Sequence, residues 1–297
     1  MKTLGVLGGM AAAALLLCIG EMYREQKIFQ VTKYVFQTKK VSPSSEKIKI
    51  LFLSDQHNKI YGNTNEVLYE AVGEEKPDLI LIGGDMLIGK RGVSAKPALD
   101  FVSRLPRICP VYYVNGNHEQ RMKEGEDYFC SAYENYKKML QKAGVYFLEN
   151  ESVNIDIRGT ALCISGLELP LHTYKKFQTF SICAEDIKKC IGDAREERLH
   201  ILLAHNPAFA EAYKKWGADL VLAGHLHGGL VRFPGWRGVI TPQFKLFPKY
   251  SGEMQKENGQ AVIVSRGLGM HTIKIRLFNK AEIVSVSLVH PAEKISL

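Results

Sequence analysis

The sequence predicts an α/β protein with a second sheet. Short apolar runs of strand length alternate with segments whose apolar residues have helical spacing. Three further β-rich segments follow near the C-terminus, and these extra strands predict the second sheet. Hydrophobic residues make up 46% and charged residues 24% of the 297-residue chain, a globular composition that excludes a disordered protein.

The N-terminal segment is predicted to be a membrane anchor. Thr3–Gly20 is an 18-residue run without a charge. A helix of that length reaches about 27 Å, enough to cross a bilayer core. A cleaved signal peptide is the alternative, but no small-x-small cleavage pattern follows the apolar run. We therefore expect an anchor at residues 1–22, a juxtamembrane segment and edge strand at 23–47, and one domain at 48–297.

The remaining elements follow from their apolar patterns, in chain order. Short apolar or β-branched and aromatic runs predict strands at Val31–Gln37, Ile48–Leu53, Leu79–Ile82, Val111–Val114, Val153–Ile157, Ala161–Ile164, Ile201–Leu203, Leu220–Leu222, Gln260–Ser265, Ile273–Phe278 and Glu282–Leu288. Apolar residues spaced three and four apart predict helices at Asn63–Glu75, Tyr133–Ala143 and Ala184–Cys190.

Charge and cysteine content narrow the class of protein. The formal charge of +8 permits a nucleic acid or an anionic membrane as partner, but no run of five or more basic residues selects either one. The six cysteines contain no C-x-x-C pair, which excludes a zinc ribbon and a thioredoxin-type site.

Five apolar strands end in polar or turn-forming residues. The clusters are Asp55-Gln56-His57, Gly84-Asp85, Gly116-Asn117-His118-Glu119, His205-Asn206 and Gly224-His225-Leu226-His227. Because the carboxyl ends of strands in an open α/β sheet line one crevice where ligands bind, we expect these clusters to meet at one rim.

Together these side chains predict a site for two divalent metal ions. Each cluster alone has an ordinary explanation, since Asp-x-His can cap a helix and Gly-Asp is common turn chemistry. Carboxylate oxygens and imidazole nitrogens are ligands of divalent metals, and a pair of ions about 3.5–4 Å apart is held by several such groups. The expected ligands are Asp55, His57, Asp85, Asn117, His205, His225 and His227. The absence of thiolate from this set argues against a structural zinc site.

At these residues the sequence resembles the calcineurin-like metallophosphoesterase superfamily. The set D-x-H, G-D, G-N-H-E, H and G-H-x-H is matched in order between about Ile48 and Leu288. The N-terminal run, Gly228-Gly229 and the segment 265–269 (SRGLG) are similar to the bacterial membrane-anchored branch. The resemblance implies a four-layer α/β/β/α sandwich, metallo-dependent phosphatase-like, after an N-terminal transmembrane helix.

The resemblance also implies a role for each residue. The first ion would be held by Asp55, His57, Asp85 and His227, with Asp85 bridging to a second ion completed by Asn117, His205 and His225. His118 would act as general acid toward the leaving oxygen, and Glu119 would orient its ring. The implied reaction is hydrolysis of a phosphodiester or phosphomonoester by metal-activated hydroxide, with Mn, Fe or Zn as the expected metals.

Several substrates and locations are compatible with this reaction. An anchor would place the site near the bilayer, which favours a lipid or envelope-derived phosphoester at the cell membrane. The resemblance favours the extracytoplasmic side, whereas the Lys and Arg count favours the cytoplasmic side. A lipid-facing or substrate-gating loop is one interpretation of eight aromatic and basic residues, although an ordinary loop packed on the domain is favoured over it. The eight are Arg232, Phe233, Trp236, Arg237, Phe244, Lys245, Phe247 and Lys249.

The alternative functions are a nuclease, a cyclic-nucleotide-type phosphodiesterase and a non-catalytic metal-binding module. Nucleic acid is the less favoured partner, because much of the positive charge flanks the N-terminal run, where anionic lipid is nearer. A non-catalytic module is disfavoured because every ligand position and the acid position are filled.

Overall fold

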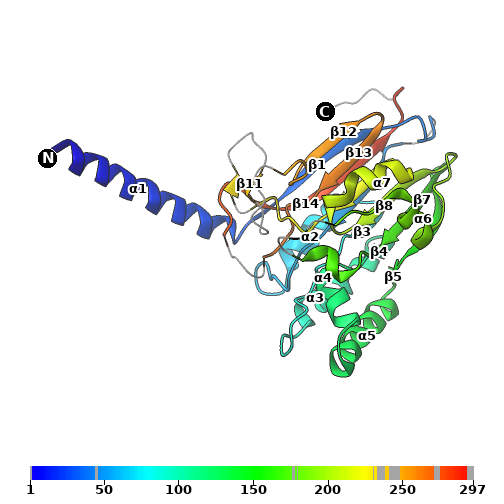
Figure 1. The fold of residues 1–297 in the computed structure, drawn as a ribbon, viewed down its shortest axis with the longest axis horizontal. Helices are drawn as coiled ribbons and strands as arrows, with labels where there is room; N and C mark the ends of the chain where they lie inside the picture. Colours follow the sequence, from blue (N-terminus) through cyan, green and yellow to red (C-terminus); the bar gives the residue numbers. More distant parts are fainter. Residues whose placement is uncertain are drawn as a thin grey trace.

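Two six-stranded sheets form the centre of the molecule (Figure 1). The computed structural model describes residues 2–43, 46–175, 178, 180–229, 231–232, 238–240, 248–270 and 275–292. The first sheet contains, in spatial order, β1 (Phe29–Gln37), β14 (Ala281–Val289), β2 (Ile48–Leu53), β3 (Leu79–Ile82), β4 (Val111–Tyr113) and β5 (Val145–Phe147). The second contains β12 (Met254–Glu257), β13 (Gln260–Val264), β9 (Leu220–Ala223), β8 (Leu199–Ala204), β7 (Thr160–Leu167) and β6 (Glu151–Ile157). The predicted two-sheet α/β fold is confirmed.

Helices cover the outer face of each sheet. The first sheet packs against α2 (Glu66–Glu74), α3 (Lys96–Val102) and α5 (Asp127–Lys142), and the second against α6 (Ala184–Ile191) and α7 (Ala210–Trp216). In β2, Ile50 and Phe52 face the apolar layer between the sheets, whereas Leu51 and Leu53 face the helices. Because the strand is buried on both sides, its sequence is continuously apolar rather than alternating.

The strand directions place the predicted polar clusters at one edge. β2, β3, β4 and β5 are mutually parallel, and so are β7, β8, β9 and β13. In each sheet the carboxyl ends of these strands therefore lie at one edge, where ligands bind in such folds. The expected β6–β7 hairpin and the edge position of β1 are both present.

Several short elements complete the chain. They are α4 (Asn117–Lys123), η1 (Leu105–Arg107), η2 (Leu171–Tyr174), η3 (Pro207–Phe209), β10 (Val231–Arg232) and β11 (Gly238–Ile240). The strand predicted at Ile273–Phe278 is wrong in its described part, because Ile275–Phe278 runs as a loop with one bridge residue at Leu277. Of the residues interpreted as a lipid-facing or substrate-gating loop, Phe233, Trp236, Arg237, Phe244, Lys245 and Phe247 lie outside the described residues.

The N-terminal helix forms where the sequence predicts it, but not as the anchor that was expected. α1 (Lys2–Glu25) extends away from the sheets (Figure 1), and its last residue Glu25 is buried against the body of the protein. Within the described part of the chain, no helix combines the length and the apolar character needed to cross a membrane, so the predicted anchor and the cell-membrane location based on it are wrong. In Thr3–Gly20, nine of the 18 residues are Gly, Ala or Thr, which offer little apolar surface.

Candidate metal centre

The structure brings the predicted ligands together from both sheets. Each follows the carboxyl end of a strand: Asp55 and His57 after β2, Asp85 after β3, Asn117 after β4, His205 after β8, and His225 and His227 after β9. Two groups have ligand atoms that all lie within 4.8 Å of one another, namely Asp55–His57–His227 and Asp85–His205–His225. A third group joins His57, Asp85 and His118. Residues separated by up to 172 positions in the chain therefore form one cluster.

Asp85 lies at the middle of this cluster. Its Oδ2 atom is 3.3 Å from His205 Nε2, 3.8 Å from His57 Nε2 and 3.9 Å from His118 Nε2. Its other oxygen, Oδ1, accepts the backbone N–H of His118 at 2.8 Å. The separations of 3.8 and 3.9 Å are longer than a hydrogen bond, so the Nε2 atoms of His57 and His118 lie near Oδ2 without bonding to it.

Asp55 organises the other half of the cluster. Asp55 Oδ1 lies 3.7 Å from His227 Nε2 and 3.8 Å from His57 Nε2. The backbone N–H of His225 donates to both carboxylate oxygens, at 3.1 and 3.0 Å. His57 thus lies within 3.8 Å of both carboxylates, as expected of a ring between two neighbouring ligand groups.

The electrostatics of the cluster favour a cation. Burial, reinforced by the nearby Asp85 carboxylate, raises the pKa of Asp55 to about 6. Burial also opposes ionisation of Asp85, but the surrounding histidines hold the pKa of Asp85 well below its usual range. Burial would lower the pKa of His205, yet the Asp85 and Asp55 carboxylates raise it to about 10. Two buried carboxylates so close together need positive charge beside them.

The ligand-bearing loops adopt a backbone conformation that L-residues rarely take. Positive φ angles between 47° and 70° occur at five of the seven predicted ligands: Asp55, His57, Asp85, His225 and His227. Backbone hydrogen bonds between two loops hold this conformation, because Asp55 N–H donates to Gly84 O at 2.9 Å and His57 N–H to Asp85 O at 3.0 Å. Strain of this kind clusters at functional sites, and it persists only where the surroundings over-determine it.

The hydrogen bonding of Asn117 and His205 shows whether the predicted ligands suit divalent ions. Asn117 Oδ1 is buried and has no hydrogen-bond partner among the described residues, which leaves it available as a ligand. His205 lies 2.6 Å through Nδ1 from the Gly83 carbonyl, so this nitrogen carries a proton and Nε2 faces Asp85. Metal-binding histidines usually donate their other ring N–H to such a carbonyl. The residues fit a pair of ions bound through nitrogen and oxygen.

His118 has a defined tautomer. Its Nδ1 accepts the backbone N–H of Gly89 at 2.9 Å, so the proton of the neutral ring is on Nε2, which faces Asp85. Burial lowers the pKa of His118, although the Asp85 carboxylate opposes this shift. The cluster therefore contains one neutral imidazole that points an N–H into the centre.

The Glu119 carboxylate accepts hydrogen bonds from the turns that carry Asp85 and precede Asn117. The donors are the backbone N–H groups of Asp85 (2.8 Å), Met86 (2.8 Å) and Gly116 (3.1 Å). Tyr113 also donates its hydroxyl to this carboxylate at 2.7 Å. Burial, with Asp85 nearby, raises the pKa of Glu119 to about 7. Glu119 thus stabilises the loop that carries Asp85 through hydrogen bonds to its backbone.

Two further features of the centre were missed from the sequence. The Tyr174 ring lies edge-on to the His225 ring at 5.0 Å between centroids and 6.1 Å from the His205 ring. The segment 265–269 packs its backbone on Asp55, with Gly269 N–H donating to Asp55 O at 2.6 Å. At Gly267, a Cβ atom would lie 2.7 Å from Asp55 Cβ. The glycines in SRGLG were a visible signal for this contact, whereas no local motif marks Tyr174.

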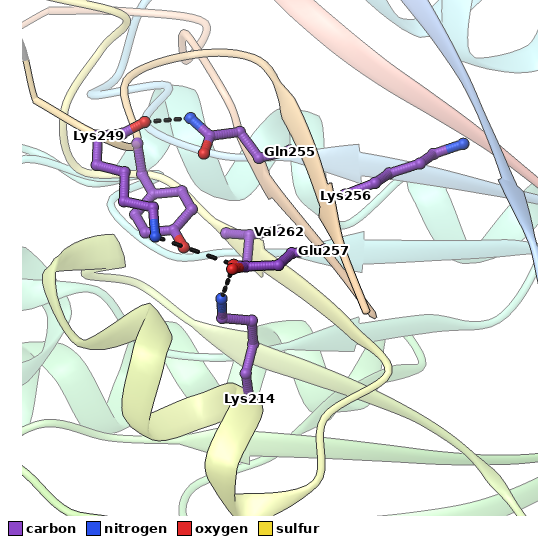
Figure 2. Close-up of a pocket in the computed structure, with 7 residues that line it drawn as sticks. Lys214, Lys249, Gln255, Lys256, Glu257 and Val262 are labelled. Carbon is purple, nitrogen blue, oxygen red and sulfur yellow. Dashed lines mark hydrogen bonds and ion pairs between the residues drawn. The ribbon is translucent and has the colours of Figure 1, made fainter. Parts of the chain in front are cut away.

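A separate cavity of about 290 Å³ contains none of the predicted site residues (Figure 2). It lies between α7 and the β12–β13 hairpin, and two of its three lysines are engaged in ion pairs. Lys214 Nζ is 2.5 Å from Glu257, and Lys249 Nζ is 2.6 Å from Glu211. The third lysine, Lys256, donates to the Val35 carbonyl. Among the residues that the structure describes, the cavity lining contains no group of metal-ligand residues, which separates it from the centre described above.

Comparison with known proteins agrees with the geometry of the centre. A family model described as calcineurin-like phosphoesterase matches residues 48–229, more than half of the chain. The chain is 27% identical over 293 residues to the uncharacterized protein YpbG of Bacillus subtilis (strain 168), with 98% of each chain covered. It is 25% identical to the uncharacterized metallophosphoesterase YkoQ of the same organism, over 88% of this chain and 90% of YkoQ. It is 28% identical to phosphodiesterase YaeI of Escherichia coli (strain K12), over 81% of this chain and 82% of YaeI.

Proposed function

Since the chain belongs to the calcineurin-like phosphoesterase family, we propose that it hydrolyses a phosphodiester at a centre of two divalent metal ions. The observation that carries this proposal is the convergence of two carboxylates and the surrounding imidazoles at the Asp55 and Asp85 groups. The buried Asn117 Oδ1, at the start of α4 after β4, adds a candidate oxygen ligand. The choice of a diester over a monoester is supported by the relative YaeI, which is named a phosphodiesterase.

The two groups of ligand atoms suggest how the ions would be shared. We assign Asp55, His57, Asp85 and His227 to one ion and Asp85, Asn117, His205 and His225 to the other. When bound, such ions stabilise charge on the phosphoryl oxygens and lower the pKa of water. Nitrogen and oxygen donors of this kind suit Mn, Fe or Zn.

His118 is proposed as the group that serves the leaving oxygen. A water oxygen attacks phosphorus, the bond from phosphorus to the leaving oxygen breaks, and the departing alkoxide must gain a proton or a hydrogen bond. His118 can donate only from Nε2, because Nδ1 accepts from Gly89. The lowered pKa of His118 keeps the ring neutral near pH 7, so Nε2–H acts as a hydrogen-bond donor to developing negative charge.

Glu119 is proposed as a positioning residue. Its hydrogen bonds to the backbone of Asp85, Met86 and Gly116 fix the turn that carries the shared carboxylate and the turn that precedes Asn117. A lipid or envelope-derived substrate is not retained, because the main argument for it was the membrane anchor, which the structure contradicts.

The test is a metal-dependent assay on the full chain. Metal content would be measured first, followed by hydrolysis of bis-p-nitrophenyl phosphate and p-nitrophenyl phosphate with and without Mn²⁺. We expect Mn²⁺-dependent cleavage of the diester that is lost in Asp85→Asn. The matched control is Asp100→Asn, which makes the same change at an exposed aspartate on α3. Metal-independent cleavage, or full activity of Asp85→Asn, would contradict the proposal.

A further inference from the structure

A buried asparagine outside the ligand set supports the turn that carries one of the ligands. We propose that Asn279 is a positioning residue for His227, and that Glu25 at the end of α1 fixes Asn279 in place. The inference rests on the proposed metal centre, to which His227 is assigned.

The side-chain amide of Asn279 is directed entirely at the His227 turn. Its Nδ2 atom donates to His227 O at 2.7 Å and to Gly229 O at 2.6 Å. Asn279 is fully buried, with 0% of its surface exposed, so water does not compete for these two carbonyls. A primary amide is the smallest neutral side chain that offers two N–H donors from one atom.

The turn needs this support because of its backbone conformation. His227, Gly228 and Gly229 are three consecutive residues with positive φ, at 51°, 71° and 88°. Glycine adopts this region freely, whereas His227 adopts it only with backbone strain. The fit is also tight, since a Cβ atom at Gly228 would lie 2.5 Å from Asn279 Oδ1. The amide thus holds the one strained residue of the turn that is also a proposed ligand.

Asn279 is itself held from two sides. Its backbone N–H donates to Glu25 Oε2 at 2.8 Å, and its carbonyl accepts from Arg276 Nη1 at 3.1 Å. Glu25 is the last residue of α1 and is only 2% exposed. Arg276 also donates from Nη2 to the Gly267 carbonyl at 3.0 Å, in the segment that packs on Asp55. These buried hydrogen bonds therefore connect α1 to the His227 turn and to the segment that packs on Asp55.

Replacing the amide nitrogen would disturb this turn selectively. In Asn279→Asp the side chain keeps its shape, but an oxygen faces two carbonyl oxygens and both hydrogen bonds are lost. His227 would then be released from the geometry in which its Nε2 lies 3.7 Å from Asp55 Oδ1. Among the described residues, the hydrogen bonds of Asn279 go to Glu25, Arg276, His227 and Gly229 and not to His205 or Asn117, so the second ion should be retained.

The experiment is a calorimetric Mn²⁺ titration of the EDTA-stripped full chain. We expect two Mn²⁺ sites in the unmodified protein and a loss of about 10–100-fold in the affinity of one site in Asn279→Asp. His227→Ala should weaken the same site. Asn258→Asp, the same change in the exposed β12–β13 turn, should bind as the unmodified protein does. Thermal unfolding of the stripped proteins should show Asn279→Asp still folded at the titration temperature, with a lower midpoint than Asn258→Asp because two buried hydrogen bonds are lost.

The outcomes separate this inference from the proposed function. Two intact Mn²⁺ sites in a folded Asn279→Asp would overturn the inference and leave the metal centre standing. No Mn²⁺ binding by the unmodified protein would overturn the metal centre itself. If Asn279→Asp does not fold, Glu25→Ala and Glu25→Gln carry the test. Only the glutamine variant keeps an acceptor for Asn279 N–H, so equal Mn²⁺ binding by these two variants would overturn the role of Glu25.

Discussion

Truncation of His118 provides the sharpest test of the chemistry. In His118→Ala the donor at Nε2 is lost, while the seven proposed ligands and their supporting hydrogen bonds to Gly83, Gly84 and Glu119 remain. General acid catalysis contributes roughly 10²–10⁴-fold to a rate, or about 3–5 kcal/mol of barrier. Because burial lowers the pKa of His118, the neutral ring donates a hydrogen bond and does not transfer a full proton. We therefore expect a loss of turnover near the lower end of that range, about 10²–10³-fold.

The assay compares two diesters that differ in the leaving group. A p-nitrophenyl group departs as a stabilised anion that hardly needs a donor, whereas a phenyl group departs as a more basic anion that needs one. His118→Ala should therefore lose much more of its turnover on the phenyl diester than on the p-nitrophenyl diester. Metal content should match that of His290→Ala, whereas the unfolding midpoint should be lower, because His118→Ala removes a buried side chain and leaves the Gly89 N–H without its acceptor. His290 follows β14, which runs antiparallel to β2, so this control lies at the opposite edge of the sheet.

Two results would refute the assignment of His118. Unchanged turnover of the phenyl diester would remove its role in catalysis. An equal loss on both diesters, with full metal content, would mean that His118 acts on the centre itself and not on the leaving oxygen. The structure motivates this second comparison, because His118 N–H also donates to Asp85 Oδ1 at 2.8 Å.

Three further predictions concern the surroundings of the centre. Gly84→Ala should lower the free energy of unfolding, measured in urea, by roughly 2–4 kcal/mol. The reason is that φ at Gly84 is +85° and that a Cβ atom there would lie 2.1 Å from Gly116 N. A decrease below about 1 kcal/mol would contradict this prediction. Burial opposes ionisation of Glu149, but its lysine and tyrosine partners lower its pKa to about 2. The ionised carboxylate therefore contributes to the free energy of unfolding above the unfolded-state pKa of about 4, and this contribution is lost as the pH falls toward 2. Acid unfolding of Glu149→Gln should therefore depend less on pH in this window than that of the unmodified protein, and parallel curves would contradict the assignment. Lys214→Met should lower the free energy of unfolding by about 1 kcal/mol, because it removes the ion pair with Glu257 (Figure 2). Diester turnover should stay unchanged. A loss of turnover would show that this cavity is coupled to the centre.

The sequence predicted the sheets and the ligand clusters because both depend on patterns that burial imposes. A strand covered on both faces must be apolar throughout, so Ile48–Leu53 and Leu79–Ile82 are recognisable as runs. The polar residues that interrupt such runs stand out at their carboxyl ends. The short helix α4 was missed because its sequence NHEQRMK contains a single large apolar residue, Met122, and so has no helical periodicity.

Contacts between distant residues could not be predicted from these patterns. The family resemblance implied that Glu119 would orient the His118 ring. In the structure the Glu119 carboxylate accepts the backbone N–H groups of Asp85 and Met86, and the backbone N–H of Gly89 donates to the His118 ring at Nδ1. Tyr174 and Asn279 approach His225 and His227 only through the tertiary fold, so no local spacing marks them.

The strained ligand loops explain why the centre depends on both sheets. An Asp-x-His segment in extended conformation would place Asp55 and His57 on the same side of a strand, but both have left-handed φ angles and belong to a turn. That turn is held by the Asp85 loop, and Asp55 in turn receives His225 N–H from the second sheet. Each ligand loop therefore depends on hydrogen bonds from another ligand loop. It follows that changes to residues that touch no ion, such as Gly84, Glu119 and Asn279, should affect the centre through the conformation of these loops.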